Sequence, residues 1–132
     1  MDFDLSQEQT LIRETFSRFC SKELSPEYVK WMDENCDYVP DEMMSKFGEL
    51  GLFGLTIPEE YGGQGLGMIE LAIVIEEISK RSAAAAMCAA ISLSFGAMPI
   101  LKMGNAEQKV RFLPDIASGK TRWSLALTEP AG

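Results

Sequence analysis

The first pattern that could do chemistry is a glycine-rich run at residues 62–67, GGQGLG. Backbone amides at the start of a helix bind phosphate, and glycines let a ligand approach them closely. This run does not have dinucleotide-binding spacing after a strand, and no Walker lysine follows it. We therefore interpret it as a tight structural turn, with phosphate binding as the alternative.

Few side chains in the sequence are of the types that act as nucleophiles, bases or metal ligands. There is no histidine, which removes the commonest general base, Ser-His and Cys-His pairs, and most zinc sites. Cys20, Cys36 and Cys88 are far apart and form no CxxC pair, which favours reduced thiols in a cytoplasmic protein. Cys88 has nothing nearby to lower its pKa, so we predict a small apolar residue. The residues alone predict no catalytic group and no metal site.

The composition limits the class of protein. The 132 residues suffice for one domain with a hydrophobic core. The net charge of −8 argues against nucleic-acid binding, which depends on clustered lysine and arginine. Residues 1–4 are acidic and lack the basic and apolar regions of a secretory signal, so we expect a cytoplasmic location.

Apolar residues recur at helical spacing over most of the chain. Five helices are predicted: from Ser6 to Ser25-Pro26, from Pro40 to Gly51, from Met68 to Ile78, from Ala83 to Gly104, and from the cap at Asn105 to Gly119. Residues 28–39 are interpreted as a connecting segment. Pro114 is expected to break or bend the last helix.

The alanine-rich stretch 83–101 has no charged residue and is long enough to cross a membrane. Its many alanines make it weakly hydrophobic, and aromatic anchors are missing from its flanks. We predict a core helix that is apolar on all sides, and no membrane span.

The chain changes character after Gly119, where residues 121–127 read as a strand. The predicted fold is therefore all-α, a five- to six-helix orthogonal or bundle domain with one terminal β-strand. Because the type of structure changes at the end of the sequence, we expect a domain junction there and a longer parent protein.

Four groups of residues, in order, resemble the N-terminal domain of the acyl-CoA dehydrogenases. They are residues 49–55 with 57–63, 97–101 leading into 104–109, 112–114 with 117–119, and 127–130. The resemblance covers essentially the whole chain. It implies an N-terminal helical domain at 1–120 and, at 121–132, the first strand and flavin loop of a middle β-domain.

The resemblance also implies a chemistry. Members of the family have a helical domain, a β-domain and a C-terminal four-helix bundle, with FAD between the last two. They carry out α,β-dehydrogenation of an acyl-CoA thioester in fatty acid metabolism. A glutamate takes the α-proton, hydride passes to the flavin, and electrons usually leave to an electron-transfer flavoprotein. We expect acyl-CoA, that flavoprotein and a homo-oligomer as partners.

The resemblance assigns binding roles to two groups of residues. Leu125, Leu127 and Thr128 fall where the family's first strand and loop meet the flavin, Thr128 through its hydroxyl and backbone. The middle of the fourth helix lines the acyl channel in relatives, and core packing is the alternative for each of its residues. The candidates there are Met87, Cys88, Ile91, Ser92 and Phe95.

The family's catalytic glutamate lies in the C-terminal bundle and has no counterpart in these residues, so we expect the isolated chain to be inactive and not to retain FAD. The alternative is a non-catalytic helical interaction module derived from the family. Self-association through Trp123, Leu125 and Leu127 would favour a fragment of the enzyme, because an apolar strand needs a partner to cover it.

Overall fold

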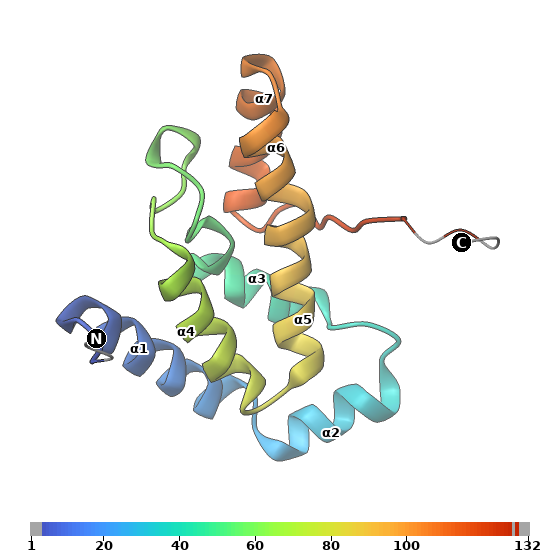
Figure 1. Ribbon diagram of the computed structural model, residues 1–132. Helices are drawn as coiled ribbons and strands as arrows, with labels where there is room; N and C mark the ends of the chain where they lie inside the picture. The colour runs from blue at the N-terminus through green and yellow to red at the C-terminus, as the bar shows by residue number, and fades with distance from the viewer. Residues whose placement is uncertain (1–3, 128, 130–132) are drawn as a thin grey trace.

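Figure 1 shows the computed structural model of the protein, which describes residues 4–127 and 129. The described residues form an all-α domain, and the helical prediction is confirmed. Three consecutive segments, α5, η3 and α6, make one continuous helix. The elements are α1 (Gln7–Glu23), α2 (Pro26–Asn35), α3 (Asp41–Glu49), η1 (Leu52–Gly54), η2 (Glu59–Tyr61), α4 (Met68–Ser79), α5 (Ala83–Ile91), η3 (Ser92–Ala97), α6 (Met98–Met103) and α7 (Ala106–Ala117).

The start of α1 is determined locally. The Ser6 hydroxyl oxygen accepts from the Gln9 amide at 3.1 Å, and the Gln9 side chain accepts from the Ser6 amide at 3.0 Å. This capping box satisfies amides that a helix start leaves unpaired. Further along, Phe16 and Cys20 are buried where α1 packs across α4, so the amphipathic pattern selects the packed face.

The prediction of a connecting segment at 28–39 is wrong, because most of it is α2. The first helix does end just before Ser25-Pro26, as predicted, but the same pair also begins the next helix. The Ser25 hydroxyl oxygen accepts from the Tyr28 amide at 3.2 Å. Proline is well suited to the first helical position, where its missing N–H has no partner to lose.

The expected break at Pro114 does not occur, since α7 continues to Ala117. Proline in the last turn removes one backbone hydrogen bond, and the helix continues to Ala117 without it. A capping box of Asn105 and Gln108 fastens its start, and Leu113 and Ile116 are buried in the core.

The continuous helix Ala83–Met103 runs vertically in Figure 1, beside α4. Length and composition would let it cross a membrane, which is weak evidence because core helices meet the same criteria. We predicted burial on all sides, but only 39% of its most apolar 18-residue window is buried. Its buried side carries Ala85, Ala89 and Leu93, whose small or compact side chains let α4 approach closely.

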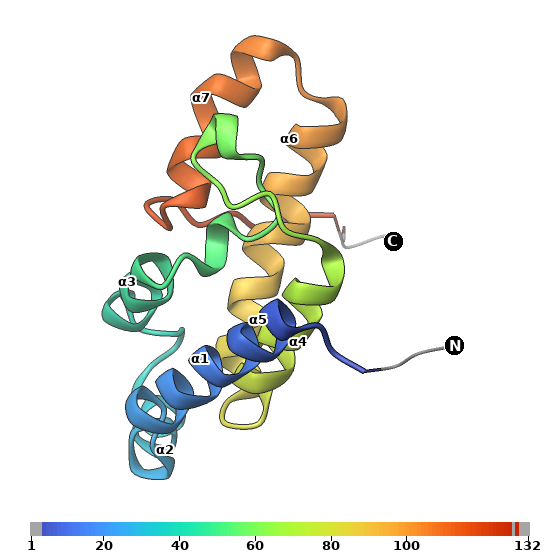
Figure 2. The ribbon, with the colours of Figure 1, turned by 90° about the vertical axis from the view of Figure 1, so that its left-hand side faces the viewer.

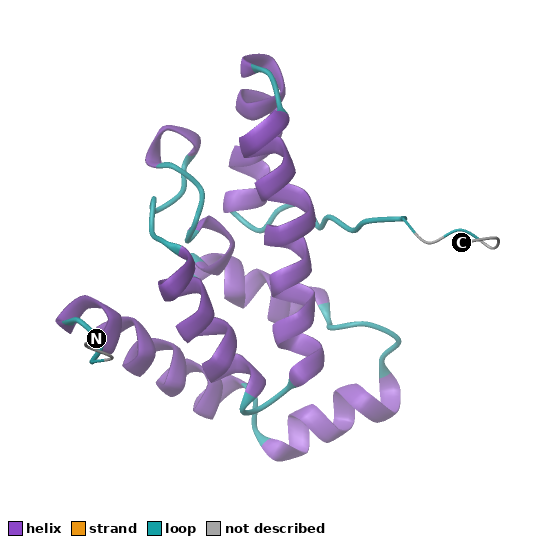
Figure 3. Ribbon diagram, in the orientation of Figure 1, coloured by secondary structure: helices purple, strands orange, loops and turns teal. Residues whose placement is uncertain are grey.

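The predicted terminal strand is not present in the described residues. Residues 122–127 are an irregular segment that passes the long helix and extends away from the domain (Figure 3). A strand exists by pairing its backbone with a neighbour. The described part of the chain places no second strand beside it, so β-propensity alone does not produce one.

Candidate functional site

The glycine-rich run is a tight structural turn, as predicted. The amides of Gln64, Gly65 and Leu66 donate to carbonyls of residues 54, 57 and 55 at 2.7–2.9 Å. The Gly67 amide at the start of α4 donates to the Glu70 carboxylate at 2.9 Å. The amides of residues 62–67 are thus already paired and an acidic side chain occupies the helix start, which argues against the phosphate-binding alternative.

The predicted acyl-channel residues share one side of α5 and η3, which we call the outer face. Their spacing of one, four, five and eight residues places them along one helix face. Met87 is 61% exposed and Phe95 44% exposed, while Cys88 and Ile91 are half-buried and Ser92 is buried. The structure thus brings the five residues together and leaves the largest apolar ones open.

Two features set the position of this face. Ser82 caps α5, its hydroxyl oxygen accepting from the Ala85 amide at 3.2 Å. Further on, the helix widens into the π-turn η3, where the Met98 amide donates to the Leu93 carbonyl five residues back. Such π-turns are frequent at functional sites and bend the helix that contains them.

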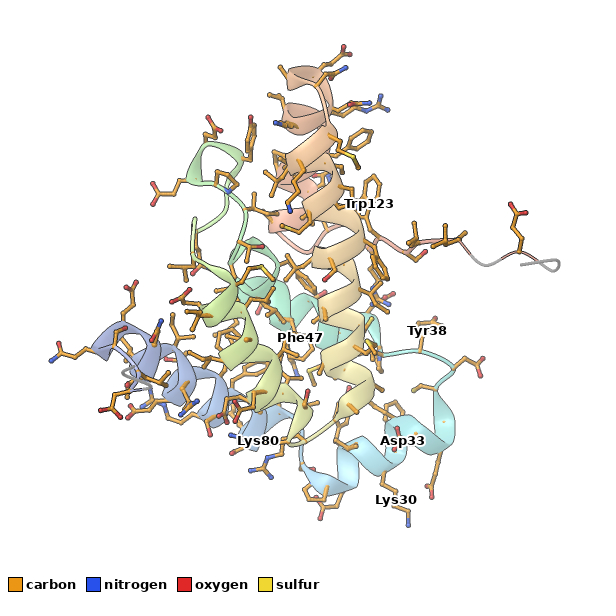
Figure 4. The ribbon with its side chains drawn as sticks, in the orientation of Figure 1. Lys30, Asp33, Tyr38, Phe47, Lys80 and Trp123 are labelled. Carbon is orange, nitrogen blue, oxygen red and sulfur yellow. The ribbon has the colours of Figure 1, made fainter. Side chains whose placement is uncertain are left out.

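The segment after α7 contacts the π-turn through Trp123, and Figure 4 shows this side chain against the long helix. A Cβ atom on Gly96 would lie 2.7 Å from the Cβ of Trp123, so only glycine permits this approach. The indole also meets Phe112 edge-on, with ring centroids 5.5 Å apart at 78°. Its Nε1 donates to the Thr121 hydroxyl at 3.2 Å.

Arg122 holds the same segment on its other side. Its guanidinium donates to the Val39 carbonyl at 3.2 Å and forms an ion pair with Asp41. It also lies 6.0 Å from the centre of the Tyr38 ring, which Figure 4 places on the connection between α2 and α3. A cation over an aromatic face is attracted by the ring quadrupole.

Two of the predicted flavin contacts, Leu125 and Leu127, come shortly after Trp123 in the chain. Leu125 is 53% exposed and Leu127 75% exposed, so both present apolar surface without a cover in the described structure. Thr128 lies outside the described residues.

The outer face offers apolar surface and no side chain suited to act as an acid or base. Burial raises the pKa of the Cys88 thiol, and the positive charge of Arg122 only partly offsets this, so the thiol stays protonated at neutral pH. The Ser92 hydroxyl donates to the Cys88 carbonyl at 3.3 Å. Among the described residues, no group of His, Cys, Asp or Glu side chains could hold a metal ion.

Sequence reasoning missed Gly96 and Arg122. Gly96 lies three residues before Pro99 inside an apolar helical run. A glycine at such a position indicates a distorted helix or the close approach of another segment, and we did not use this signal. No sequence signal pointed to Arg122, whose partners are more than 80 residues away.

The described residues form a helical domain that exposes an apolar face on α5 and η3. Residues 6–120 match the family model described as acyl-CoA dehydrogenase, N-terminal domain. The chain therefore belongs to the acyl-CoA dehydrogenase family, and the resemblance inferred from its motifs is confirmed.

Known proteins resemble this chain in sequence and in structure. An acyl-CoA dehydrogenase of Bacillus subtilis is 38% identical over 126 residues, which are 96% of this chain and 33% of that protein. The FAD complex of Bacillus anthracis acyl-CoA dehydrogenase superimposes with a TM-score of 0.87 at 34% identity, covering 98% of this chain and 22% of that one.

A third similar chain comes from structural work on the electron transferring flavoprotein of Acidaminococcus fermentans. Its TM-score is 0.91 at 33% identity, and the match covers 99% of this chain and 34% of that one. The chain thus spans about one third of the length of the curated relatives it matches, for example 33% and 34% of two Bacillus subtilis proteins.

Proposed function

We propose that this chain is the N-terminal part of an FAD-dependent acyl-CoA dehydrogenase, in which it supplies one wall of the acyl pocket and the start of the flavin loop. The observation that carries the proposal is the outer face itself. An apolar helix face with Met87 and Phe95 open lies beside a segment that extends exposed leucines, within a fold whose relative is complexed with FAD.

The residues present fit such a cofactor on physical grounds. Leu125 and Leu127 expose apolar surface that a flat aromatic ring system would cover, gaining about 25 cal/mol for each Å² removed from water. When bound, FAD supplies the hydride acceptor for α,β-dehydrogenation. In this proposal residues 1–120 form the helical domain and 121–132 begin a β-domain.

The part played by this chain's own residues is binding and exclusion of water. Met87, Ile91 and Phe95 offer apolar contacts to an acyl chain, and the buried Ser92 hydroxyl is used within the helix. Because the protonated Cys88 thiol cannot take an α-proton, the base comes from outside this face, as expected for a glutamate elsewhere in the enzyme.

An electron-transfer flavoprotein as acceptor, a homo-oligomeric assembly and a cytoplasmic location belong to the same proposal. The similarity to a chain from the Acidaminococcus fermentans flavoprotein work supports the redox context. The alternative, a helical interaction module without catalysis, draws support from the same exposed leucines, which a protein partner would also cover.

The first test is the natural polypeptide that carries this sequence. Its intact mass and FAD content should identify a flavoprotein much larger than 14.6 kDa, whose flavin loses colour anaerobically when acyl-CoA is added. A colourless protein near that mass, inert toward acyl-CoA, would favour the interaction module.

The second test is the acyl-binding role of the outer face. Met87→Ala should raise KM for acyl-CoA by about tenfold, because a buried methionine contributes about 1.5–3 kcal/mol when fully covered. Met103→Ala is the matched control, a methionine on the same continuous helix that is 81% exposed. Equal effects of the two substitutions would argue against an acyl wall at Met87.

A further inference from the structure

The segment that follows α7 begins where two backbone hydrogen bonds close the end of that helix. The amides of Lys120 and Thr121 both donate to the Asp115 carbonyl, at 3.0 and 3.2 Å, and close the end of α7. In the next two residues the contacts are made by side chains, those of Arg122 and Trp123. Leu125 and Leu127 beyond them are exposed.

These two side chains hold the segment from opposite sides. Trp123 lies against Gly96 of the long helix and Phe112 of α7. Arg122 reaches the connection between α2 and α3, where it bonds Val39 and Asp41. Because the two neighbouring side chains are fixed to different elements, the pair limits rotation of the segment about its own axis.

That rotation decides where the leucines face. Leu125 and Leu127 lie two and four residues beyond Trp123, so a rotation of the backbone at residues 122 and 123 turns both leucines with it. Without Arg122, the indole of Trp123 would be the one remaining anchor among these two residues, and the orientation of the segment beyond it would be less fixed.

We propose that Arg122 is a positioning residue for the flavin: by binding Val39 and Asp41 it orients the segment so that Leu125 and Leu127 present their apolar side to the cofactor. This inference rests on the proposed function. It goes beyond that function in assigning the orientation of the flavin segment to a contact within the helical domain.

The size of the effect follows from the exposure of the groups. The side chain of Asp41 is 86% exposed and that of Arg122 33%, so the ion pair is weak and salt should weaken it further. The hydrogen bond to the Val39 carbonyl is partly buried and adds to it. Losing both should reduce the oriented population, and hence the apparent FAD affinity, about three- to tenfold.

The experiment compares variants of the complete enzyme that carries this chain. Arg122→Gln removes the charge and the forked donors, and Arg122→Lys keeps the charge with one donor group. Arg111→Gln is the matched control, because Arg111 is an exposed arginine of α7 that lies 5.0 Å from the Phe112 ring and lines the same cleft as Arg122. FAD dissociation constants, flavin absorption spectra, unfolding temperatures and hydrogen exchange of residues 121–127 in the apoenzyme are measured for each.

We expect Arg122→Gln to weaken FAD binding about three- to tenfold, alter the flavin spectrum and speed hydrogen exchange at 124–127, with an unfolding temperature close to wild type. Arg122→Lys should recover part of the affinity, and Arg111→Gln should match wild type.

The inference is overturned if the wild-type enzyme binds FAD and Arg122→Gln binds it equally well with an unchanged spectrum, or if Arg111→Gln has the same effect. A lower unfolding temperature of Arg122→Gln without a change in its FAD affinity would also overturn the inference. A wild-type enzyme that does not bind FAD would refute the proposed function, and the positioning role with it.

Discussion

The contact between the π-turn and the terminal segment can be tested by adding one methyl group. Gly96→Ala would place a Cβ atom 2.7 Å from the Cβ and 2.8 Å from the Cγ of Trp123. Ordinary van der Waals contact needs about 3.4–4 Å, so the indole has to move away by roughly 1 Å. The π-turn η3 is packed against α7, whereas the segment from Arg122 onward is held only by side chains.

The free energy of unfolding should change little. Replacing glycine by alanine in a helix stabilises it by about 1 kcal/mol. Displacing Trp123 loses an edge-on aromatic pair of about 0.5–1.5 kcal/mol and part of the indole burial, about 1 kcal/mol. The net destabilisation is about 1 kcal/mol, or a fall in unfolding temperature of roughly 3–5 °C.

The informative signal is therefore local. When the 132-residue chain carries Trp31→Phe, Trp123 is the remaining tryptophan of these residues. In the Gly96→Ala variant its emission should shift to the red, and the indole should become more accessible to a quencher. Ser94→Ala is the control, because Ser94 is an exposed residue of the same π-turn. If Gly96→Ala leaves the Trp123 emission and quenching unchanged, the indole does not rest on Gly96, and our account of the segment is refuted.

Three further substitutions test the packing that supports the site. Gly63→Ala should destabilise the domain by more than about 3 kcal/mol in a circular-dichroism melt, because its Cβ would overlap the Ile57 carbonyl oxygen, a backbone atom that cannot move aside; a wild-type melt would show that the loop rearranges freely. Ser82→Ala should cost about 1 kcal/mol by removing the cap on the Ala85 amide, measured by denaturant unfolding, and a smaller loss than 0.3 kcal/mol would place the helix start elsewhere. Burial raises the pKa of the Cys20 thiol from 9.0 to about 11, with a smaller contribution from the charge of Glu77. Since the folded pKa is the higher one, this stability is complete below pH 9 and is lost as the pH rises toward 11, by about 2–3 kcal/mol. Cys20→Ala should remove that alkaline loss from the pH profile of stability, and an unchanged profile would contradict it.

Much of the helical framework could be predicted because its signals are local. The capping boxes at Ser6 and Asn105 join residues three apart, so their side chains determine the helix start before any packing exists. The glycine-rich turn is similar, since Gly62 and Gly65 adopt positive φ that other residues rarely do. The second helix was equally readable from Ser25 and was missed by taking its proline as a stop.

The clustering of the predicted acyl-channel residues on one helix face also follows from sequence, through the 3.6-residue period. The sequence does not predict which of these residues are exposed to solvent. Met87 and Phe95 remain exposed while Ser92 is buried, because the long helix is covered only in part, by α4 along α5 and by α7 along η3. The exposure of Leu125 and Leu127 on the terminal segment likewise depends on which elements lie beside them.

The sequence by itself determined where helices begin, which face of each is apolar, and the family to which the chain belongs. The tertiary structure decided how the terminal segment is held. Arg122 meets Val39 across 83 residues of chain, and Trp123 needs the bare backbone of Gly96. Figure 2 gives a second view of the segment leaving the domain. Local hydrogen bonds are encoded by neighbouring residue types, whereas contacts at this separation exist only after the helices have packed and brought their partners within reach.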